Sequence, residues 1–551
     1  MAQYLTNVPI QGQISLDPQS ILFLCNQLAE TKTEVNLSDK ELSKKLRPAY
    51  AAPFSKFEHQ NDAKLVTIAL LKNVLSPVRR VPPEILSEIF EWYCFSEKKD
   101  VTGWRHDIVA CYVPTLVRVC VAWRNRAHGT PRIWSKFCLD SIRHHRVFEH
   151  ASHGCWIGGW LSRSRGVPLD ISLNFRDHSF SLEKILTFHR KIRSLSIGGY
   201  LGTWEGLFRR HMQRAGSTTF LPELEHLFIL DEMKRPEGRD TFYHSAGSPT
   251  ETITIFCKAS KLRTVKIKEP RYDYSVLQHV KLPAAQLTSL DISVFRSDGG
   301  GRFDPKVYAE FLDQCSNLVN LQFHPSILFD PSLSLHFPAL RKLVITCAGY
   351  QENATKVDLL HCLTTPLLHD LTIQCGWPTV THIRMIIENL LRLKARSEIV
   401  LSSLTLVNFW DGRCRTAQTT AMIVDLLAHF PTIQSFVILD LKADVSDLFQ
   451  AMTFGTQDHL QLLPHLTDLQ IKWDHQAYRQ YPVALNVMIK SRSWAGSERD
   501  LTDDRHEFCR SSEQWRLKRV VMRGFPEFQR EIQPIRDISD LDLNYMNWWE
   551  D

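Results

Sequence analysis

The feature that most constrains the fold is a spacing of apolar residues that recurs along the last two thirds of the chain. Its form is Leu-x-x-Leu-x-Leu, with other apolar residues allowed, and it occurs eleven times: Ile192-Leu195-Ile197, Leu224-Leu227-Ile229, Leu262-Val265-Ile267, Leu287-Leu290-Ile292, Leu318-Leu321-Phe323, Leu340-Leu343-Ile345, Leu368-Leu371-Ile373, Leu401-Leu404-Leu406, Ile433-Phe436-Ile438, Leu466-Leu469-Ile471 and Leu517-Val520-Met522. In each, the last two apolar positions are separated by one residue, as in a strand buried on one face.

Helix-like stretches lie between these motifs, for example 307–315, 381–393 and 419–430. Alternating strands and helices predict a parallel sheet. One short strand plus one helix per unit is the arrangement of leucine-rich repeats, in which the inward positions fill a continuous core. Successive motifs start between 22 residues (Leu318 to Leu340) and 51 residues (Leu466 to Leu517) apart. Standard repeats take about 20–29 residues, so the pattern resembles a degenerate array. An ordinary α/β domain is the alternative.

A second pattern lies near residue 81, where Pro82 and Pro83 open a predicted helix, a position at which a missing N–H costs little. Its apolar residues fall on one face, namely Ile85, Leu86, Ile89, Phe90 and Tyr93. A second predicted helix follows, with Leu116, Val119, Cys120, Trp123 and Ala127 on one face, and Thr130-Pro131 ends it just before Ile133-Trp134. Two ordinary core helices would give the same periodicity.

The ordered set Pro-Pro-Glu-Ile-Leu-Ser-Glu-Ile-Phe, Val-Cys-x-x-Trp-Arg and Thr-Pro-Arg-Ile-Trp resembles an F-box of the kind common in large fungal (basidiomycete-type) families. Val81 departs from the leucine usual there, and residues 160–164 and 168–171 resemble the family's continuation. The resemblance covers roughly residues 75–175. The expected fold is therefore α/β, with an N-terminal helical F-box followed by an irregular leucine-rich-repeat solenoid of parallel strands and outer helices.

The resemblance implies a substrate-recognition subunit of an SCF-type ubiquitin ligase. The F-box would bind a Skp-family adaptor and, through it, a cullin, while the repeats hold an unknown protein substrate. Such a chain supplies proximity rather than a catalytic group, so it is expected not to be an enzyme. The residues expected to contact the adaptor are Pro82, Pro83, Ile85, Leu86, Ile89, Phe90, Val119, Cys120, Trp123 and Trp134.

Substrate contacts are expected on the outward positions of the repeat strands, which alternate with core positions. The candidates are His226, Phe228, Lys266, Lys268, Asp291, Gln322, His324, Asp370, Thr372, Gln374, Gln470 and Lys472. Two other functions stay open. One is an adaptor-binding F-box protein with a structural or regulatory role outside a ligase, and the other is an enzyme within an α/β domain after residue 165.

The predicted organisation has five parts. Residues 1–60 form a helical or irregular region, 61–140 the F-box with a preceding helix over 62–75, and 141–165 a linker. Residues 166–525 form the repeat domain and 526–551 an acidic tail. Within the first part, residues 21–28 predict a short helix, and Ser38-Asp39-Lys40-Glu41 predicts the start of another.

Composition indicates which classes of partner and which cellular compartment to expect. The formal charge of +6 is small for 551 residues, and the basic residues are scattered, so nucleic acid is not expected as a partner. No apolar run has the roughly 18 residues that span a bilayer, and the N-terminus lacks a signal-peptide pattern. The thirteen cysteines include no Cys-x-x-Cys. Reduced thiols in a cytoplasmic or nuclear protein that binds no membrane are expected.

The sequence contains no standard catalytic or metal-binding motif of the kinds sought. The chain has no phosphate-binding Gly-x-x-x-x-Gly-Lys-Ser/Thr loop, no His-Glu-x-x-His and no Gly-x-Ser-x-Gly. His and Cys gather at His144, His145, His150, His153 and Cys155, but their order matches no standard zinc spacing. We expect neither a metal nor a cofactor.

Overall fold

The chain forms two compact units, Met1–Ser172 and Leu173–Asp551. The computed structural model describes residues 17–45, 52–75, 81–95, 109–140, 153–175, 184–199, 208, 220–231, 252–269, 275–294, 304–325, 327–347, 357–376, 379–410, 416–442, 444–454, 462–474, 483–493, 516–524, 528–536, 538 and 541–547.

The first unit opens with two long helices, α2 (Pro18–Lys45) and α3 (Ala52–Leu75). They pack through Leu24 of α2 and Leu71 and Val74 of α3. The predicted helix start at Ser38 is wrong, because no proline or glycine interrupts α2 between residues 21 and 45. The predicted domain boundary at residue 60 also falls inside a helix, since α3 begins ten residues before the expected Asp62.

The predicted F-box segment contains α4 (Pro83–Phe95), α5 (Val109–Val119), α6 (Val121–His128) and a 3-10 turn, η2 (Pro131–Trp134). The prolines open α4 as predicted, and the Leu86 N–H donates to the Pro82 carbonyl at 3.0 Å. The second predicted helix is wrong as one element. The backbone of Cys120 is extended, and its Sγ accepts the Trp123 N–H at 3.4 Å, so Cys120 caps α6 and separates it from α5.

The predicted linker 141–165 contains a helix, α8 (His153–Arg163), that belongs to the core of the first unit. The ring of Trp160 lies 4.7 Å from Trp134 and 6.3 Å from Phe137, and all three rings are buried. Phe137 comes from β1 (Lys136–Asp140). The boundary between the two units then falls within β2 (Leu169–Phe175).

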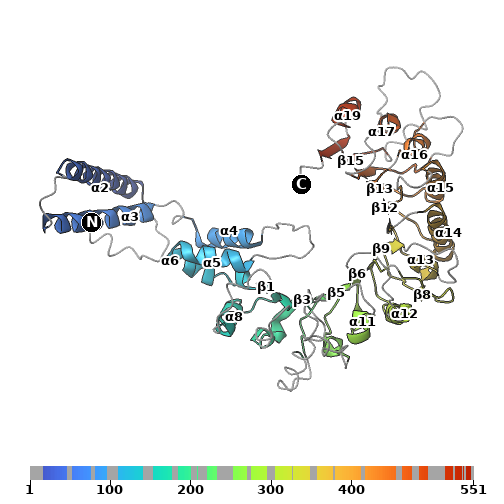
Figure 1. Cartoon of the computed structure of the whole chain (residues 1–551), viewed down its shortest axis with the longest axis horizontal. Helices are drawn as coiled ribbons and strands as arrows, with labels where there is room; N and C mark the ends of the chain where they lie inside the picture. Colours follow the sequence, from blue (N-terminus) through green and yellow to red (C-terminus); the bar gives the residue numbers. More distant parts are fainter. Residues whose placement is uncertain are drawn as a thin grey trace, which may run out of the picture. The chain divides into compact units, whose positions relative to one another are not determined.

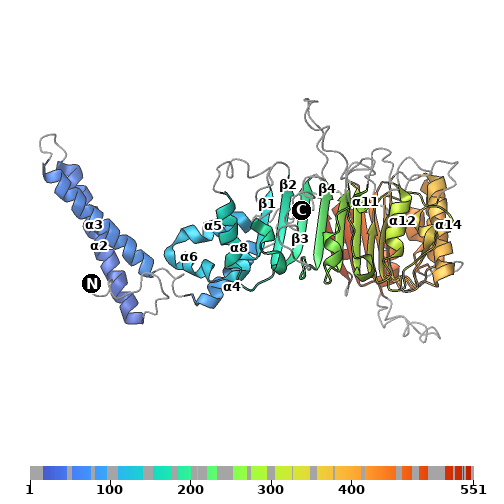
Figure 2. The same cartoon turned by 90° about the horizontal axis from the view of Figure 1, so that it is seen from below.

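The second unit is built on parallel strands that lie side by side in chain order, as predicted (Figures 1 and 2). They are β3 (Ile192–Gly199), β4 (His226–Asp231), β5 (Thr264–Glu269), β6 (Ser289–Val294), β7 (Asn320–Phe323), β9 (Lys342–Cys347), β11 (Asp370–Cys375), β12 (Ser403–Val407), β13 (Ser435–Leu441), β14 (Asp468–Trp473), β15 (Arg519–Gly524) and β16 (Asp542–Asn547). Two further strands, β8 (Leu335–His336) and β10 (Leu363–Thr364), pair with each other in a small separate sheet.

The central residues of the eleven motifs pair across neighbouring strands in one register. Leu195 pairs with Leu227, and Leu227 with Val265. The series continues through Leu290, Leu321, Leu343, Leu371, Leu404, Phe436, Leu469 and Val520. These side chains are buried, with at most 2% of their surface exposed. The motif residues therefore form the single continuous core that the spacing predicted.

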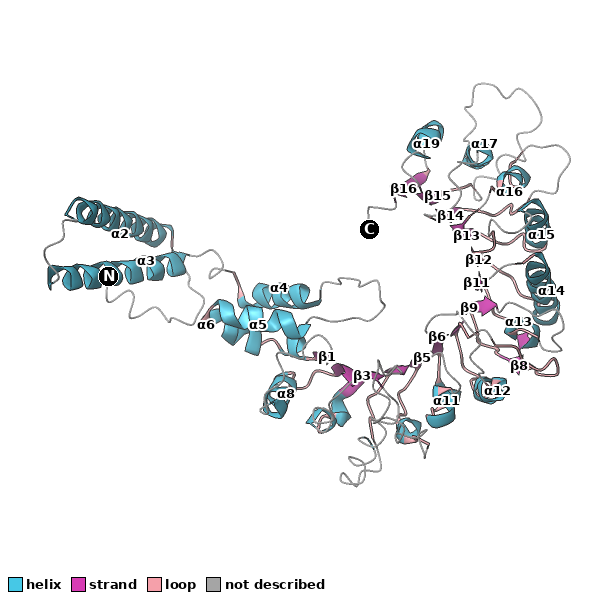
Figure 3. Cartoon of the chain, viewed as in Figure 1, coloured by secondary structure: helices cyan, strands magenta, loops and turns pink. Residues whose placement is uncertain are grey.

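Helices cover the outer side of the sheet, and the strands line the inner side of the curve that this unit forms (Figures 1 and 3). The described helices are α11 (Val276–His279), α12 (Pro305–Asp313), α13 (Leu359–Cys362), α14 (Val380–Ser397), α15 (Thr416–Ala428), α16 (Ser446–Ala451), α17 (Val483–Ser493) and α19 (Phe528–Arg536). The helices predicted over 307–315, 381–393 and 419–430 are confirmed as α12, α14 and α15, with ends shifted by a few residues.

Each main-sheet strand from β5 to β15 starts on the same kind of backbone hydrogen bonds. The Glu225 carbonyl accepts the N–H groups of both Arg263 and Thr264 at 3.0 Å, and the Arg263 carbonyl accepts those of Thr288 and Ser289. The same two-donor arrangement recurs at the carbonyls of Thr288, Val319, Arg341, His369, Ser402, Gln434 and Thr467. Buried backbone groups are costly to leave unpaired, so this repeated contact fixes where each strand begins against its neighbour.

The sheet continues beyond residue 525, where the sequence predicted only an acidic tail. Residues 528–536 form α19, and β16 pairs with β15 in parallel, with Leu543 opposite Val520. The apolar motif does not extend to β16, because Asp540 stands where the other motifs have their first apolar residue.

Gly524, near the end of β15, permits close packing between Trp473 and Phe528, whose rings lie 5.3 Å apart. A Cβ atom at residue 524 would lie 3.0 Å from Cε3 of Trp473 and 3.1 Å from Cδ2 of Phe528. We expect Gly524→Ala to lower the free energy of unfolding by about 1–3 kcal/mol, because an added methyl overpacks a filled core. Chemical denaturation measures this change. Gly376→Ala is the control, since its Cβ would meet no atom within 4 Å; equal effects of the two substitutions would contradict the packing argument.

Candidate protein-interaction surfaces

The residues predicted to bind an adaptor divide into exposed and buried groups. Ile85 and Ile89 of α4 are 45% and 46% exposed, Val119 at the end of α5 is 55% exposed, and Pro82 is exposed as well. Ile85, Ile89 and Val119 stay in contact with solvent although their helices have a core to pack against. They are therefore available to a partner.

Phe90 and Trp134 are instead buried within the first unit. The Phe90 ring packs 5.0 Å from Trp123, and Trp134 Nε1 donates to the Ala127 carbonyl at 2.6 Å. Pro83, Leu86, Cys120 and Trp123 are partly buried. The sequence placed both groups on one apolar stripe and could not separate the residues that hold the unit together from those at its surface.

The structure adds Trp92, which is 74% exposed and was not among the predicted contacts. Trp92 follows Ile85 by seven residues and Ile89 by three, so the three side chains share a helix face. Helical spacing from Ile85 could have found it. Tyr93 and Val121, 36% and 37% exposed, add apolar area on α4 and α6. We name Ile85, Ile89, Trp92, Val119 and Val121 the apolar helix surface.

Two titratable groups, one on α4 and one on α6, have shifted pKa values. Burial raises the pKa of the Cys94 thiol, on the inner side of α4, to about 12, so this cysteine is a neutral packing residue. Burial also lowers the pKa of His128, with smaller contributions from Arg163 and Arg124. An ion pair between Arg132 and Glu91, 2.8 Å long, ties η2 to α4.

The twelve predicted substrate contacts all lie on the inner side of the sheet in the second unit. His226 and Asp370 precede the central core residue of their strands. Phe228, Lys266, Asp291, Gln322, Thr372 and Gln470 follow it directly, and Lys268, His324, Gln374 and Lys472 lie two residues further on. Buried and accessible residues alternate along the strands as predicted. The shared register therefore places these twelve residues in three rows across one face of the sheet.

Charged side chains on the inner side are largely paired with each other. Lys266 lies 2.9 Å from Asp291 and 5.9 Å from the centre of the Phe228 ring. Asp370 pairs with Lys342 at 2.9 Å. Each pair joins neighbouring strands, so the charges neutralise one another along the row rather than giving the face one sign.

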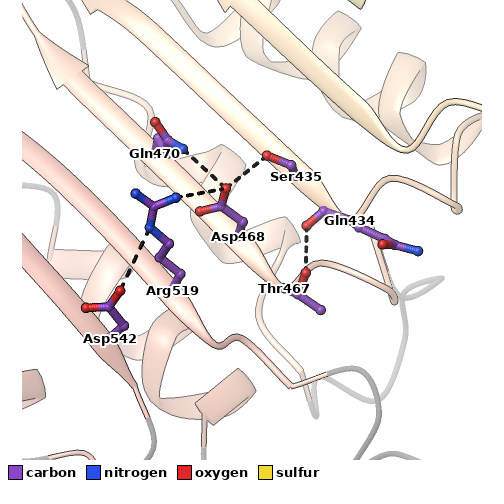
Figure 4. Close-up of polar contacts among 7 residues, drawn as sticks. All are labelled: Gln434, Ser435, Thr467, Asp468, Gln470, Arg519 and Asp542. Carbon is purple, nitrogen blue, oxygen red and sulfur yellow. Dashed lines mark hydrogen bonds and ion pairs between the residues drawn. The ribbon is translucent and has the colours of Figure 1, made fainter. Parts of the chain in front are cut away.

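A polar cluster joins the starts of the last four strands, β13 to β16 (Figure 4). Asp468 accepts hydrogen bonds from Ser435 and Gln470, both 3.2 Å long, and lies 4.0 Å from Arg519. Arg519 also lies 3.9 Å from Asp542. Of these five residues only Gln470 was predicted. The same strand alternation identifies Ser435, Asp468 and Arg519, whereas Asp542 belongs to β16, which lacks the apolar motif.

Between the charged clusters the inner side is uncharged along its middle row. Val344, Thr372, Thr405 and Val437 pair in sequence across β9, β11, β12 and β13. All four side chains are partly exposed. This region, which we name the central inner surface, offers methyl and hydroxyl groups and carries no charge.

No group of three or more His, Cys, Asp or Glu side chains is placed to hold a metal ion in the described part of the chain. The histidine and cysteine cluster from His144 to Cys155 falls outside the residues whose side chains are described. Among the described helices, none combines the length and apolar character needed to cross a bilayer.

Comparison with known proteins gives no match: no family model, no curated protein and no solved structure is similar to this chain.

His324 on the inner side should make stability depend on pH. Burial lowers the pKa of this imidazole, nearby Asp291 raises it, and Lys266 lowers it, for a net decrease. The unfolded chain takes up a proton near pH 6.5 and the folded chain only at lower pH, so stability present above about pH 6.5 is lost as the pH falls. We expect the free energy of unfolding to decrease from about pH 7 to about pH 5.

His324→Gln should make this decrease smaller, because glutamine keeps a hydrogen-bonding group near Thr346, whose Oγ1 lies 3.0 Å from His324 Nδ1, but does not titrate. Denaturant titrations at several pH values measure the slope. His226→Gln, at an exposed histidine of the same face, is the control. An unchanged slope in His324→Gln would show that other groups cause the pH dependence.

Proposed function

We propose that this chain is the substrate-recognition subunit of an SCF-type ubiquitin ligase. The apolar helix surface binds a Skp-family adaptor, which connects to a cullin, and the inner side of the parallel sheet binds a target protein. The single observation that carries the proposal is the exposure of Ile85, Ile89 and Trp92 on α4, within the segment that resembles an F-box.

This exposure supports an adaptor contact on physical grounds. α4 already buries Phe90 and Cys94 against its own unit, so the helix does not need its second apolar face for folding. A large exposed tryptophan beside two isoleucines is typical of the residues that contribute most to binding energy. The stripe is therefore wide enough to serve two purposes, one inside the unit and one at its surface.

The inner side of the sheet supports the second half of the proposal. Its ion pairs, Lys266 with Asp291 and Lys342 with Asp370, are satisfied within the face. A partner that covers these ion pairs leaves no buried charge unpaired, and an unpaired buried charge would be costly. The central inner surface can then supply apolar contact. The chain itself provides proximity between target and ubiquitin-charged enzyme.

The adaptor contact is tested with Ile89→Asp combined with Trp92→Asp. We expect binding to a purified Skp-family adaptor, measured by calorimetry, to weaken by more than about tenfold, because two carboxylates would have to be desolvated in the interface. Leu86 is left unchanged, since it is partly buried and its substitution would also disturb folding.

Val487→Asp on α17 is the matched control, because Val487 is an exposed apolar residue, 53% accessible, in the second unit. It should bind the adaptor like the unchanged protein. Full adaptor binding by a folded Ile89→Asp, Trp92→Asp variant would overturn the proposal. Adaptor binding without recruitment of a cullin in the same assay would favour a role outside a ligase.

A further inference from the structure

The turns that lead into the strands follow one pattern along the second unit. The N–H of the first motif residue donates to a carbonyl three residues earlier, as Leu340 does to Phe337 and Leu368 to Thr365. The same bond precedes β4, β5, β6, β7, β13 and β14. Proline often occupies the second turn position, which its fixed φ favours. The third position is exposed at Lys261, Asn317 and Leu367 and partly exposed in the other turns.

The third turn position changes character along the sheet. Near β4 and β5 it carries Glu223 and Lys261, which form an ion pair 2.6 Å long. Before β9 and β11 it carries Ala339 and Leu367, and Val400 stands at the same distance before β12. Leu367 and Val400 are 53% and 62% exposed, among the most exposed aliphatic side chains of this unit.

Prolines extend this apolar row. Pro338, Pro366 and Pro431 precede β9, β11 and β13, and all three are exposed. The strands they lead into are direct neighbours in the order β9, β11, β12, β13. Six residues thus form one row along the edge where these strands begin, which we name the apolar ridge: Pro338, Ala339, Pro366, Leu367, Val400 and Pro431. At about 4.8 Å per strand the row is about 14 Å long.

Basic residues border the apolar ridge on both sides. Arg396, near the end of α14, is exposed and donates to the Leu363 carbonyl at 2.9 Å, three residues before Pro366. Lys394 donates to the His429 carbonyl, two residues before Pro431. On the side of the strands, Arg341 is exposed directly after its turn. Glu398, at the end of α14, is the acidic residue beside Val400. The border therefore carries a net positive charge.

We propose that the apolar ridge docks a segment of a partner protein that has about five apolar residues in extended form and acidic residues on both flanks. The apolar residues cover Leu367 and Val400, while the acidic flanks meet Arg341 at the β9 end of the row and Lys394 at its β13 end. This site is separate from the inner side of the sheet and from the apolar helix surface, and it gives the chain a third contact that does not depend on the ligase role.

The test uses two synthetic peptides with the same apolar core, one flanked by glutamates and one by lysines. We expect the full-length protein to bind the glutamate-flanked peptide at least about tenfold more tightly in fluorescence polarisation, and added salt to reduce the difference. Leu367→Asp combined with Val400→Asp should abolish that binding, because the new carboxylates repel the flanks and leave the core uncovered.

Val483→Asp on α17 is the control, since Val483 is 65% exposed and lies outside the ridge; it should leave peptide binding unchanged. Equal binding of the two peptides, no binding of either, or full binding by the folded double variant would overturn the proposal. Sedimentation of the unchanged protein tests a second copy as the occupant: concentration-dependent association that the double variant loses would overturn the peptide proposal in favour of a dimer. Adaptor binding, measured in parallel, should be the same in all variants.

Discussion

The second unit depends on one backbone contact, a carbonyl that accepts two N–H groups from the start of the next strand, repeated at every main-sheet strand from β5 to β15. Side chains of parallel strands alternate with a period of two, so a slip of one residue would turn a whole strand inside out. The doubled hydrogen bond opposes such a slip at the first residues of each strand. Val265, Leu343 and Leu469 therefore enter the same core although long and unequal segments separate them in sequence.

The two surfaces of the proposed ligase role arise from different physical causes. The apolar helix surface exists because the stripe on α4 is wider than the core it packs against, so Phe90 is buried while Trp92 stays exposed. The inner side of the sheet exists because the helices cover only one side of the described strands (Figure 3). Its charges are neutralised in place, and its middle row is uncharged, so shape and apolar contact rather than net charge would select a partner.

Much of the second unit could be predicted from the sequence, because strand alternation and motif spacing report directly on burial. The register of Leu195 with Leu227 and the outward position of Lys266 both follow from that rule. Other features depend on single residues whose effect is not periodic. Cys120 divides a helix by capping the next one, and Asp540 hides a strand by replacing an apolar residue. The division of one apolar stripe into buried Phe90 and exposed Ile89 depends on the packing partner, which spacing alone does not contain.

The unequal spacing of the motifs has a consequence for how such a chain can change over evolution. Segments of very different length, from the 22 residues between Leu318 and Leu340 to the 51 between Leu466 and Leu517, connect strands that keep the same alignment. Closing a longer loop costs little extra free energy. Insertions and deletions in the connecting segments can therefore leave the inner side constant, so the proposed contact surfaces could acquire and lose partners independently.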